Sequence, residues 1–223
     1  MGRWARLPTM SDPVTMTVDE ALTTTRAVRK RLDLTRPVPH DVLLECLQLA
    51  FQAPNGSNRQ LWQWVVVDDA ATRAQMAAIY NGALEDYAKQ HTNLPPIDRT
   101  DPANQRMFES VDHLKEHLHE VPVLVVPAIR GRLDGAPITQ QAHLWGSVLP
   151  AVWSFMLALR ARGLGSCWTT AHLQHEEKMA DLLGIPYAEY TQAGLFPVAY
   201  TIGTDFKPAK RLPLDPIVHW DTW

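Results

Sequence analysis

Two pairs of cationic side chains, far apart in the chain, have the chemistry of a phosphate site. Arg26 and Arg29 stand three residues apart at the end of a predicted helix, so both can face one ligand. Lys210 and Arg211 form the second pair, and nearby prolines favour an extended backbone there. Arginine is suited to bidentate phosphate binding. Either pair alone is more typical of a charged surface, whereas convergence of the two pairs would indicate a phosphate site.

The segment 53–64, A-P-N-G-S-N-R-Q-L-W-Q-W, joins an apolar helical run to an apolar strand-like run. Pro54 cannot donate an N–H and disfavours helical geometry in the residue before it, so it ends the helix. Asn55, Gly56, Ser57 and Asn58 then favour a turn that exposes backbone N–H groups and amide side chains. Such a turn suits an uncharged ligand edge rich in hydrogen-bonding groups, although most loops of this kind are only connections.

His113, Glu116 and His117 match the H-x-x-E-H pattern of inverted zinc proteases. The two histidines, four residues apart, would share one face of a helix. The pattern also needs a third ligand, usually a downstream Glu, and the sequence offers no persuasive one. A solvated helix face is therefore the favoured interpretation, and no metal site is predicted.

Other familiar catalytic patterns do not occur in the sequence. It contains no G-x-S-x-G, no G-x-G-x-x-G and no G-x-x-x-x-G-K-[ST]. The sequence therefore predicts no serine nucleophile elbow, and a nucleotide-like cofactor would not be held as in a Rossmann or P-loop fold.

The elements that must position these residues follow from the spacing of apolar side chains. Helices are predicted at 17–25, 41–52, 70–80, 104–119, 138–162 and 176–183, and strands at 62–68, 121–129, 164–170 and 195–202. Pro122 and Pro127 argue for an edge or short strand at 121–129. The alternation is too irregular for a doubly wound parallel sheet, so an α+β fold is expected.

The predicted helix at 138–162 is strongly apolar and is interrupted by Pro150. Polar residues such as Gln140 and Arg160 keep its apolar run below the roughly 20 residues that a membrane span needs. Such a helix in a soluble protein belongs to the core or to a dimer interface.

The two ends of the chain and one internal segment are expected to be irregular. Residues 1–16 form a lead-in, and residues 91–103 form a loop. The tail, 205–223, contains no predicted helix and ends with Trp220 and Trp223 close together. Aromatic residues so late in a chain indicate that the tail packs against something, such as a partner subunit.

The composition narrows the function classes further. The 223 residues carry a formal net charge of -3, and no basic block indicates nucleic-acid binding. Cys46 and Cys167 lie far apart, so neither a disulfide scaffold nor a thiolate zinc site is expected. The N-terminus lacks the apolar core of a signal peptide, so the expected location is the cytoplasm.

Four segments, taken together, resemble the FMN-dependent nitroreductase family, and they occur in that family's order. Residues 25–29 (T-R-A-V-R) resemble its R-[RS]-[SA]-[VI]-R opening, and residues 53–62 (A-P-N-G-S-N-R-Q-L-W) resemble its A-P-S-x-x-N-x-Q-P-W. Residues 163–170 (G-L-G-S-C-W-T-T) are similar to the G-L-G strand that passes the flavin, and residues 206–215 (F-K-P-A-K-R-L-P-L-D) to a late K-R-x-P-L segment. Each motif is weak alone, but the ordered set is specific.

The resemblance implies a role for each matching residue. Arg26, Lys210 and Arg211 would bind the FMN phosphate, and Arg29 would lie near the ribityl chain and the N1/O2 edge of the flavin. A cation at that edge stabilises negative charge on the ring, which favours hydride acceptance. The complete set of implied cofactor contacts is Arg26, Ala27, Arg29, Pro54, Asn55, Gly56, Asn58, Trp168, Thr169, Thr170, Lys210 and Arg211. No catalytic side chain is implied, because the flavin carries the chemistry.

The chain departs from the family patterns at several positions. Thr25 stands where a first Arg is usual, and Ala27 replaces a frequent Ser and so lacks a hydroxyl that could donate to phosphate. Asn55 replaces Ser, Leu61 replaces Pro, and Arg31 stands where an aromatic residue is common.

The resemblance also implies an architecture and an activity. Residues 1–223 would form one domain with a mixed or antiparallel sheet flanked by helices, and residues 81–118 would form a lid. A homodimer would form around the long helix, with two flavins at the interface and with tails that wrap the other subunit. NAD(P)H would reduce FMN by hydride transfer at N5, and the reduced flavin would reduce an acceptor such as a nitroaromatic or a quinone in ping-pong fashion. Reductive dehalogenation, dehydrogenation and flavin cleavage on the same fold are the alternatives, as is a flavin-binding protein without turnover.

Overall fold

The computed structural model of the protein describes residues 15–89 and 95–223. The α-helices are α1 (Val18–Thr24), α2 (His40–Ala50), α3 (Ala70–Lys89), α4 (Pro102–His117), α5 (Ile138–Arg160) and α6 (Glu176–Leu183). The strands are β1 (Trp62–Val67), β2 (Val123–Arg130), β3 (Leu164–Ser166), β4 (Tyr190–Gln192) and β5 (Phe196–Tyr200), and the 3-10 turns are η1 (Gly56–Asn58), η2 (Leu118–Glu120) and η3 (Ala171–His175). Most of the predicted lead-in and part of the predicted loop at 91–103 lie outside the described residues.

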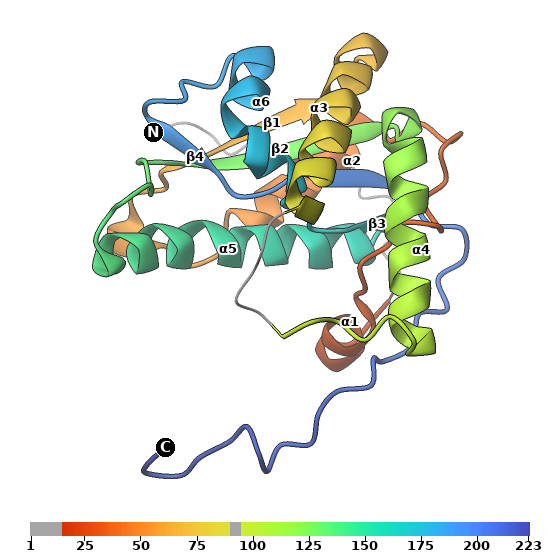
Figure 1. The fold of residues 1–223 in the computed structure, drawn as a ribbon, viewed down its shortest axis with the longest axis vertical. Helices are drawn as coiled ribbons and strands as arrows, with labels where there is room; N and C mark the ends of the chain where they lie inside the picture. Colours follow the sequence, from red (N-terminus) through yellow and green to blue (C-terminus); the bar gives the residue numbers. More distant parts are fainter. Residues whose placement is uncertain (1–14, 90–94) are drawn as a thin grey trace.

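The strands form one antiparallel sheet flanked by helices, which confirms the α+β prediction (Figure 1). The strand order is β1-β2-β5-β3, and the short β4, for which there was no prediction, pairs with β2. An isolated parallel bridge joins Ala27 to Ser166 of β3, so the N-terminal cationic motif runs along this side of the sheet.

β2 is the centre of the fold, because both of its faces are covered. Val123, Val125 and Ile129 pack into one core with α2 and α5, whereas Leu124 and Val126 pack into a second core with α3 and η2. Neighbouring residues of a strand point to opposite faces. A near-continuous apolar run is therefore the pattern of a strand that is buried on both sides.

The prediction of an edge or short strand at 121–129 is wrong. β2 has eight residues and pairs with β1 on one side and with β5 and β4 on the other. Pro127 lies between the segments that pair with β5 and with β4, and its carbonyl accepts the N–H of Ala193 at 2.8 Å. The N–H that a proline lacks would point into the same gap, so no bond of the ladder is lost.

Several predicted boundaries are confirmed and others move. α1 begins with the predicted capping box, in which the Glu20 N–H donates to Thr17 Oγ1 at 3.2 Å and the Thr17 N–H donates to the Glu20 carboxylate at 2.8 Å. α2 ends at Ala50, before the predicted end at residue 52. α3 continues to Lys89, beyond the predicted end at residue 80. The strand predicted at 164–170 ends at Ser166.

α5 is the long apolar helix that the sequence predicts, and it crosses one face of the sheet (Figure 1). By length and composition it is the one helix in the described ranges that could cross a membrane, but half of its apolar window is buried in the chain's own core. Its uncovered side is itself largely apolar. Ala142, Gly146 and Trp153 are exposed there, and Leu149 and Leu157 are half-buried, at spacings of three to four residues.

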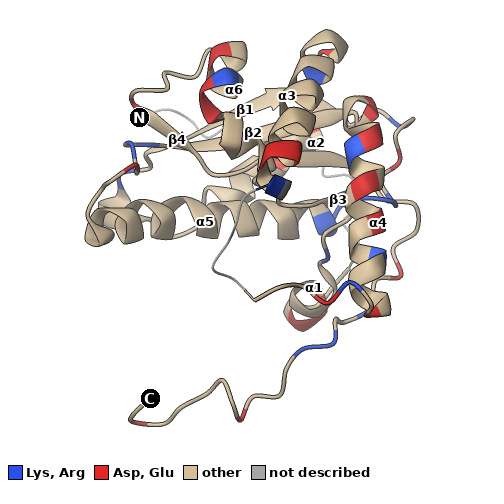
Figure 2. Ribbon diagram, viewed as in Figure 1, with Lys and Arg blue, Asp and Glu red and all other residues tan. Residues whose placement is uncertain are grey.

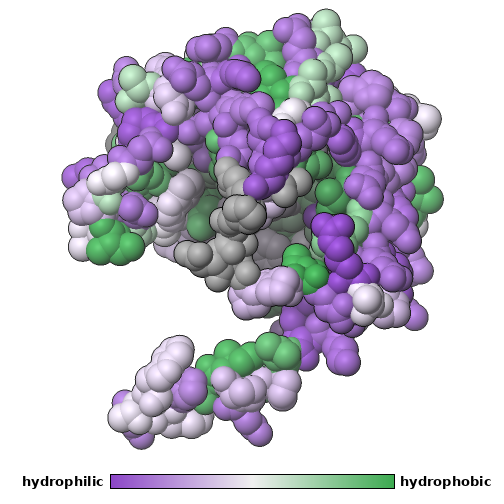
Figure 3. All heavy atoms as spheres, viewed as in Figure 1, coloured by the Kyte–Doolittle hydropathy of each residue, from purple (hydrophilic) through white to green (hydrophobic). Residues whose placement is uncertain are grey.

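The C-terminal tail, residues 205–223, contains neither helix nor strand, as predicted. It runs away from the rest of the molecule, and apolar residues lie along it (Figures 1 and 3). Trp220 is 85% exposed and Trp223 is fully exposed.

Candidate functional site

A cavity of about 460 Å³ opens between α3, α4 and the segment that follows β3. Arg29, Trp168, Thr169 and Thr170 line it. Two sequence motifs separated by more than half the chain therefore meet at one cavity. Its size lies within the range of about 300–1,000 Å³ that small-molecule sites occupy.

The opposite wall of the cavity is mainly apolar. It consists of Leu84 and Tyr87 from α3 and of Met107, Phe108 and Val111 from α4. All five residues belong to the predicted lid, 81–118, of which residues 90–94 lie outside the described ranges. Ile97, Arg99 and Asp112 from the same segment also line the cavity. Movement of the lid remains a prediction.

The segment from Trp168 to Thr170 is held rigidly beside the sheet. The Thr169 N–H donates to the Leu195 carbonyl at 3.1 Å, and the Leu195 N–H donates back at 2.8 Å. The Trp168 indole N–H donates to the Ala193 carbonyl at 2.8 Å. A β-carbon on Gly194 would overlap the Trp168 indole, and Gly194 also has a φ of +150°, so glycine is required there.

Tyr80 is a cavity residue that the sequence analysis did not select. Its phenol oxygen accepts a hydrogen bond of 3.1 Å from Thr169 Oγ1, and burial raises the pKa of the phenol. The predicted helix at 70–80 gave no signal for it, because a tyrosine at an apolar helix position is ordinarily part of the core.

Arg29 brings a positive charge to the floor of the cavity. Its Nη1 donates to Ser110 Oγ at 3.4 Å, and beneath it Cys167 is fully buried. Burial raises the pKa of the Cys167 thiol to about 11 although Arg29 opposes the shift, so the thiol stays protonated. The guanidinium of Arg29 therefore faces the cavity without a carboxylate partner in the part of the chain that the structure describes.

Arg26 lies at the start of the C-terminal tail. Its Nη1 donates to the Lys207 carbonyl at 3.3 Å. Arg31 donates to the Ile202 carbonyl at 2.8 Å and to Asp205 at 2.6 Å, which fixes the same stretch. The N-terminal motif and the start of the tail are thus in contact, and Figure 2 shows basic residues along the first part of the tail. Lys210 and Arg211 lie further along it and are exposed.

The loop that carries Pro54, Asn55, Gly56 and Asn58 lies elsewhere. The Gly56 N–H donates to Ser147 Oγ at 3.0 Å, which seats the loop on the first half of α5. Asn55 Oδ1 accepts the Gln60 N–H at 2.9 Å. Ser57, Asn58 and Gln60 have φ values of 54°, 52° and 50°, a region that side chains adopt at a cost. None of these loop residues lines the 460 Å³ cavity.

Within the chain, the two halves of the predicted site lie at different positions along α5. Gly56 contacts α5 near Ser147, whereas Arg26 and Arg160 line a small cavity at the other end of the helix. At 1.5 Å per residue, Ser147 and Arg160 are about 20 Å apart along the axis. The structure therefore groups Arg29 with residues 168–170 and places residues 54–58 apart from them.

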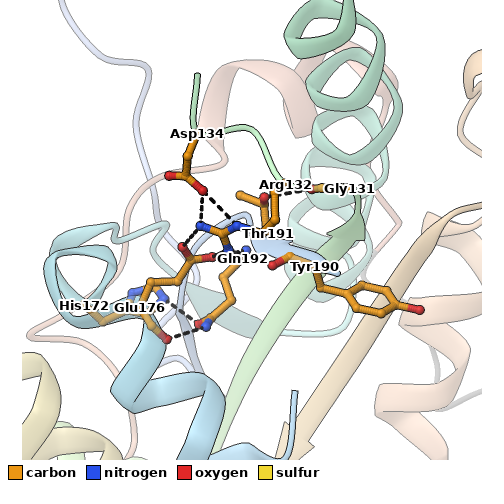
Figure 4. A network of polar contacts seen from close by, with 8 residues as sticks. All are labelled: Gly131, Arg132, Asp134, His172, Glu176, Tyr190, Thr191 and Gln192. Atoms are coloured by element: carbon orange, nitrogen blue, oxygen red, sulfur yellow. Dashed lines mark hydrogen bonds and ion pairs between the residues drawn. The ribbon is translucent and has the colours of Figure 1, made fainter. Parts of the chain in front are cut away.

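A network of polar contacts fixes η3, the turn that follows the cavity segment (Figure 4). Glu176 forms an ion pair of 2.9 Å with Arg132, and its Oε1 accepts the backbone N–H of Gln192 at 2.8 Å. Burial opposes charge on Arg132, but its hydrogen bonds to Glu176 and Asp134 raise its pKa above the usual range. His172 of η3 is completely buried and pairs with the Gln192 side chain at 3.2 Å.

The zinc pattern does not assemble into a site in the described ranges. His113 and His117 are neighbours on α4, with ring centroids 4.4 Å apart. His117 is engaged with Glu120 at 2.7 Å. No group of three or more His, Cys, Asp or Glu side chains with the geometry to hold a metal ion occurs among residues 15–89 and 95–223.

Comparison with known proteins gives a family match. The model of the nitroreductase family matches residues 22–200. A relative from Thermus thermophilus named NADH dehydrogenase is 28% identical over 197 residues, which are 82% of this chain and 87% of the relative.

Solved structures share the fold at lower identity. An iodotyrosine deiodinase bound to FMN and 3-iodo-L-tyrosine has a TM-score of 0.70 and 24% identity, and the match covers 93% of this chain and 100% of that one. A variant of an FMN- and NADPH-dependent nitroreductase from sphigopyxis sp. strain HMH has a TM-score of 0.68 and 22% identity, with the same coverage. A BluB-like flavoprotein from Clostridium difficile 630 has a TM-score of 0.68 at 17% identity, and the match again covers 93% of this chain and 100% of that one.

Proposed function

This chain belongs to the nitroreductase family of oxidoreductases, and from that premise we propose that it is an FMN-dependent enzyme that uses NAD(P)H to reduce a small organic acceptor. Bound FMN would supply the hydride chemistry at N5, in ping-pong fashion, toward an acceptor such as a nitroaromatic or a quinone. The observation that carries the proposal is the meeting of Arg29 with Trp168, Thr169 and Thr170 at one cavity of about 460 Å³.

The residues present fit such a cofactor. Arg29 lacks a carboxylate partner among the described residues, so it is free to stabilise negative charge on a flavin ring at the cavity floor. Thr169 and Thr170 line the cavity, and the pairing of Thr169 with Leu195 holds their backbone in place. The apolar wall formed by α3 and α4 would exclude water from a flat ring and from a flat acceptor stacked on it.

We propose a homodimer, because one subunit alone does not bring all twelve assigned residues together. Two copies of α5 packed antiparallel would place the loop at 54–58 of one chain beside the Arg26 end of the other. The apolar stripe of Ala142, Gly146 and Trp153 is the surface for that contact. The tails, with Lys210 and Arg211, would then close around the partner subunit. The assembly is proposed to be cytoplasmic, with no nucleic acid or membrane as a partner.

A second candidate keeps the cofactor and changes the acceptor. A structure with the same fold and a TM-score of 0.70 is an iodotyrosine deiodinase. Reductive dehalogenation is therefore the alternative reaction, and dehydrogenation, flavin cleavage and flavin binding without turnover remain further alternatives. Turnover of halophenols compared with nitroaromatics and quinones separates the reductive reactions.

The test is the visible spectrum of the purified protein before and after anaerobic addition of NADPH or NADH. A yellow protein whose flavin bands bleach, and recover when an acceptor is added, supports the proposal. A yellow protein that does not bleach with either nucleotide contradicts the NAD(P)H step. A protein that remains colourless even after addition of FMN contradicts the cofactor assignment.

A further inference from the structure

Arg160, the last residue of α5, is a buried cation that lacks an anion. It is only 7% exposed, and no carboxylate pairs with it in the part of the chain that the structure describes. Its Nη2 donates to the Thr204 carbonyl at 2.9 Å, but Nε and Nη1 have no hydrogen-bond partner. Burying an unpaired guanidinium is costly, so a partner from outside the described residues is expected.

A neighbouring arginine has the carboxylate partner that Arg160 lacks. Arg162, two residues further along, is also buried, and it donates to Glu45 at 3.2 Å, with both side chains at most 6% exposed. Arg160, by contrast, lies near a second positive charge, that of Arg31, which repels it. The contrast indicates that the missing counter-charge of Arg160 belongs to a ligand.

A second unpaired donor lies in the same place. Ser166 of β3 is 4% exposed, and its hydroxyl has no hydrogen-bond partner. Arg160 and Ser166 line one cavity of about 10 Å³, together with Thr25 and Arg26. Ser166 also forms the β-bridge with Ala27, the neighbour of Arg26. A cavity of about this volume holds roughly one water-sized group, such as a single oxygen atom of a larger ligand.

The remaining contacts of Arg160 do not use these free donors. Its guanidinium stacks on Phe206 at 4.8 Å, and Arg31 stacks on the same ring at 4.3 Å. Together with the bond to Thr204, this stacking fixes the start of the tail. Anchoring the tail therefore accounts for Nη2 and the face of the guanidinium, but not for Nε, Nη1 or the Ser166 hydroxyl.

We propose that this cavity is an oxyanion site, in which Arg160 and Ser166 donate hydrogen bonds to one oxygen of a phosphate monoester whose other oxygens lie against Arg26. The inference rests on the proposed function for the identity of the ligand, which is then the phosphate of FMN. Arg160 and Ser166 are additional to the twelve residues assigned from the sequence. Free inorganic phosphate offers the same chemistry, so the experiment must separate the two sources.

The experiment compares FMN with riboflavin, which has the same ring but no phosphate. Dissociation constants are measured by flavin fluorescence on full-length protein freed of flavin, for the wild type, Arg160→Met, Ser166→Ala and Phe206→Leu. Arg160→Met is expected to weaken FMN binding about tenfold or more and to leave riboflavin binding unchanged, because a charge-assisted bond to phosphate is lost. Ser166→Ala is expected to weaken FMN alone by a smaller factor. Phe206→Leu removes the stacked ring but keeps the donors of Arg160 and Ser166. It should leave the ratio of the FMN and riboflavin dissociation constants unchanged.

Two outcomes overturn the site and leave the cofactor assignment intact. One is a wild-type ratio of FMN to riboflavin affinity in Arg160→Met, and the other is an equal loss of both affinities, which would show that Arg160 only anchors the tail. If Arg160→Met does not fold, the ratio of FMN to riboflavin affinity in Ser166→Ala tests the site instead.

A parallel titration with inorganic phosphate makes the site testable even if the protein binds no flavin. Phosphate is expected to raise the unfolding temperature of the flavin-free wild type and not that of Arg160→Met. If the wild type binds neither flavin, the proposed function fails, but this phosphate-dependent difference would still support the oxyanion site. No effect of phosphate on the wild type would overturn it.

Discussion

Gly56 lies directly against the imidazole ring of His143, so close that a β-carbon at position 56 would overlap three of the ring atoms. One turn further along α5, Ser147 Oγ accepts the Gly56 N–H at 3.0 Å. The loop that carries four of the twelve assigned cofactor residues is therefore seated on α5 by a contact that only glycine permits.

Gly56→Ala should displace either the loop or the imidazole. His143 is exposed and its ring can turn aside, so we expect a loss of only about 1 kcal/mol in the free energy of unfolding. FMN retention should fall as well to the extent that the loop, and not the ring, is displaced. Urea unfolding and the flavin content of the purified protein measure the two effects. The double variant Gly56→Ala/His143→Ala should recover most of both losses, and an unchanged single variant would show that the contact is not required.

Arg29→Ala should lower FMN retention or slow the reduction of bound FMN by NADPH. The expected effect is about tenfold, which corresponds to the loss of one favourable charge interaction of about 1.4 kcal/mol. Flavin content and stopped-flow bleaching measure it. Lys30→Ala is the matched control, because it also removes one positive charge, but from an exposed ion pair with Glu109 at 3.0 Å. Wild-type values for Arg29→Ala in both measurements would refute its assigned role.

Glu176→Gln should destabilise the fold by about 3 kcal/mol, because it removes the buried carboxylate partner of the largely buried Arg132 and leaves only the exposed Asp134. The side chains of this pair are 19% and 12% exposed. Glu189→Gln breaks the neighbouring pair with Arg130, whose side chains are 61% and 54% exposed, and should cost less than about 1 kcal/mol. Urea unfolding at pH 7 compares the two variants. Equal losses would mean that the network of Figure 4 does not depend on the burial of Glu176.

His172 should make the protein less stable in mild acid. Burial lowers its pKa from 6.5 to about 4, and the hydrogen bond to Gln192 opposes the shift only in part. Between these two pH values the unfolded chain binds a proton that the folded chain does not. The contribution of His172 to the free energy of unfolding is therefore fully present above about pH 6.5. It falls by about 3 kcal/mol as the pH drops to 4.

The comparison of wild type with His172→Gln isolates this contribution. Gln can still donate a hydrogen bond toward Gln192, but it does not titrate. The unfolding free energy of the variant should have a slope with pH that is shallower by up to about 1.4 kcal/mol per pH unit in this window. The same slope in both proteins would show that His172 does not control acid stability.

The elements that the sequence predicted well are those whose signals are local. The Thr17–Glu20 capping box and the apolar period of α5 depend on residues within a few positions of one another, and both are confirmed. The strand at β2 was predicted, but its central place in the sheet was missed, because proline is normally excluded from central strands and Pro127 lies within β2. What permits it is the meeting of β4 and β5 opposite that residue, which no local pattern records.

The site shows the same division between local and distant contacts. Arg29 and Thr169, which the motifs selected as flavin contacts, both line the cavity, and their contacts with a flavin stay a prediction. Tyr80 was missed because its hydrogen bond with Thr169 joins a residue of α3 to a loop residue that is distant in the sequence. Arg160 was noted only as a polar residue that interrupts an apolar helix, and its lack of a counter-charge became visible only once its neighbours were placed.

The C-terminal tail gives the sharpest test of the proposed dimer. Its apolar residues cannot be serving the fold of their own subunit, because Trp220 and Trp223 are 85% and fully exposed in the single chain. Large aromatic side chains contribute strongly when an interface buries them. Trp220→Ser/Trp223→Ser should therefore raise the dimer dissociation constant about tenfold or more, measured by sedimentation velocity over a range of concentrations.

Lys210 and Arg211 are left in place in this double variant, so a change in FMN binding would follow from dissociation and not from loss of the cations. Circular dichroism should show an unchanged fold. A wild type that is monomeric at all concentrations would refute the dimer itself, whereas an unchanged dissociation constant in the variant would show that the tail lies outside the interface.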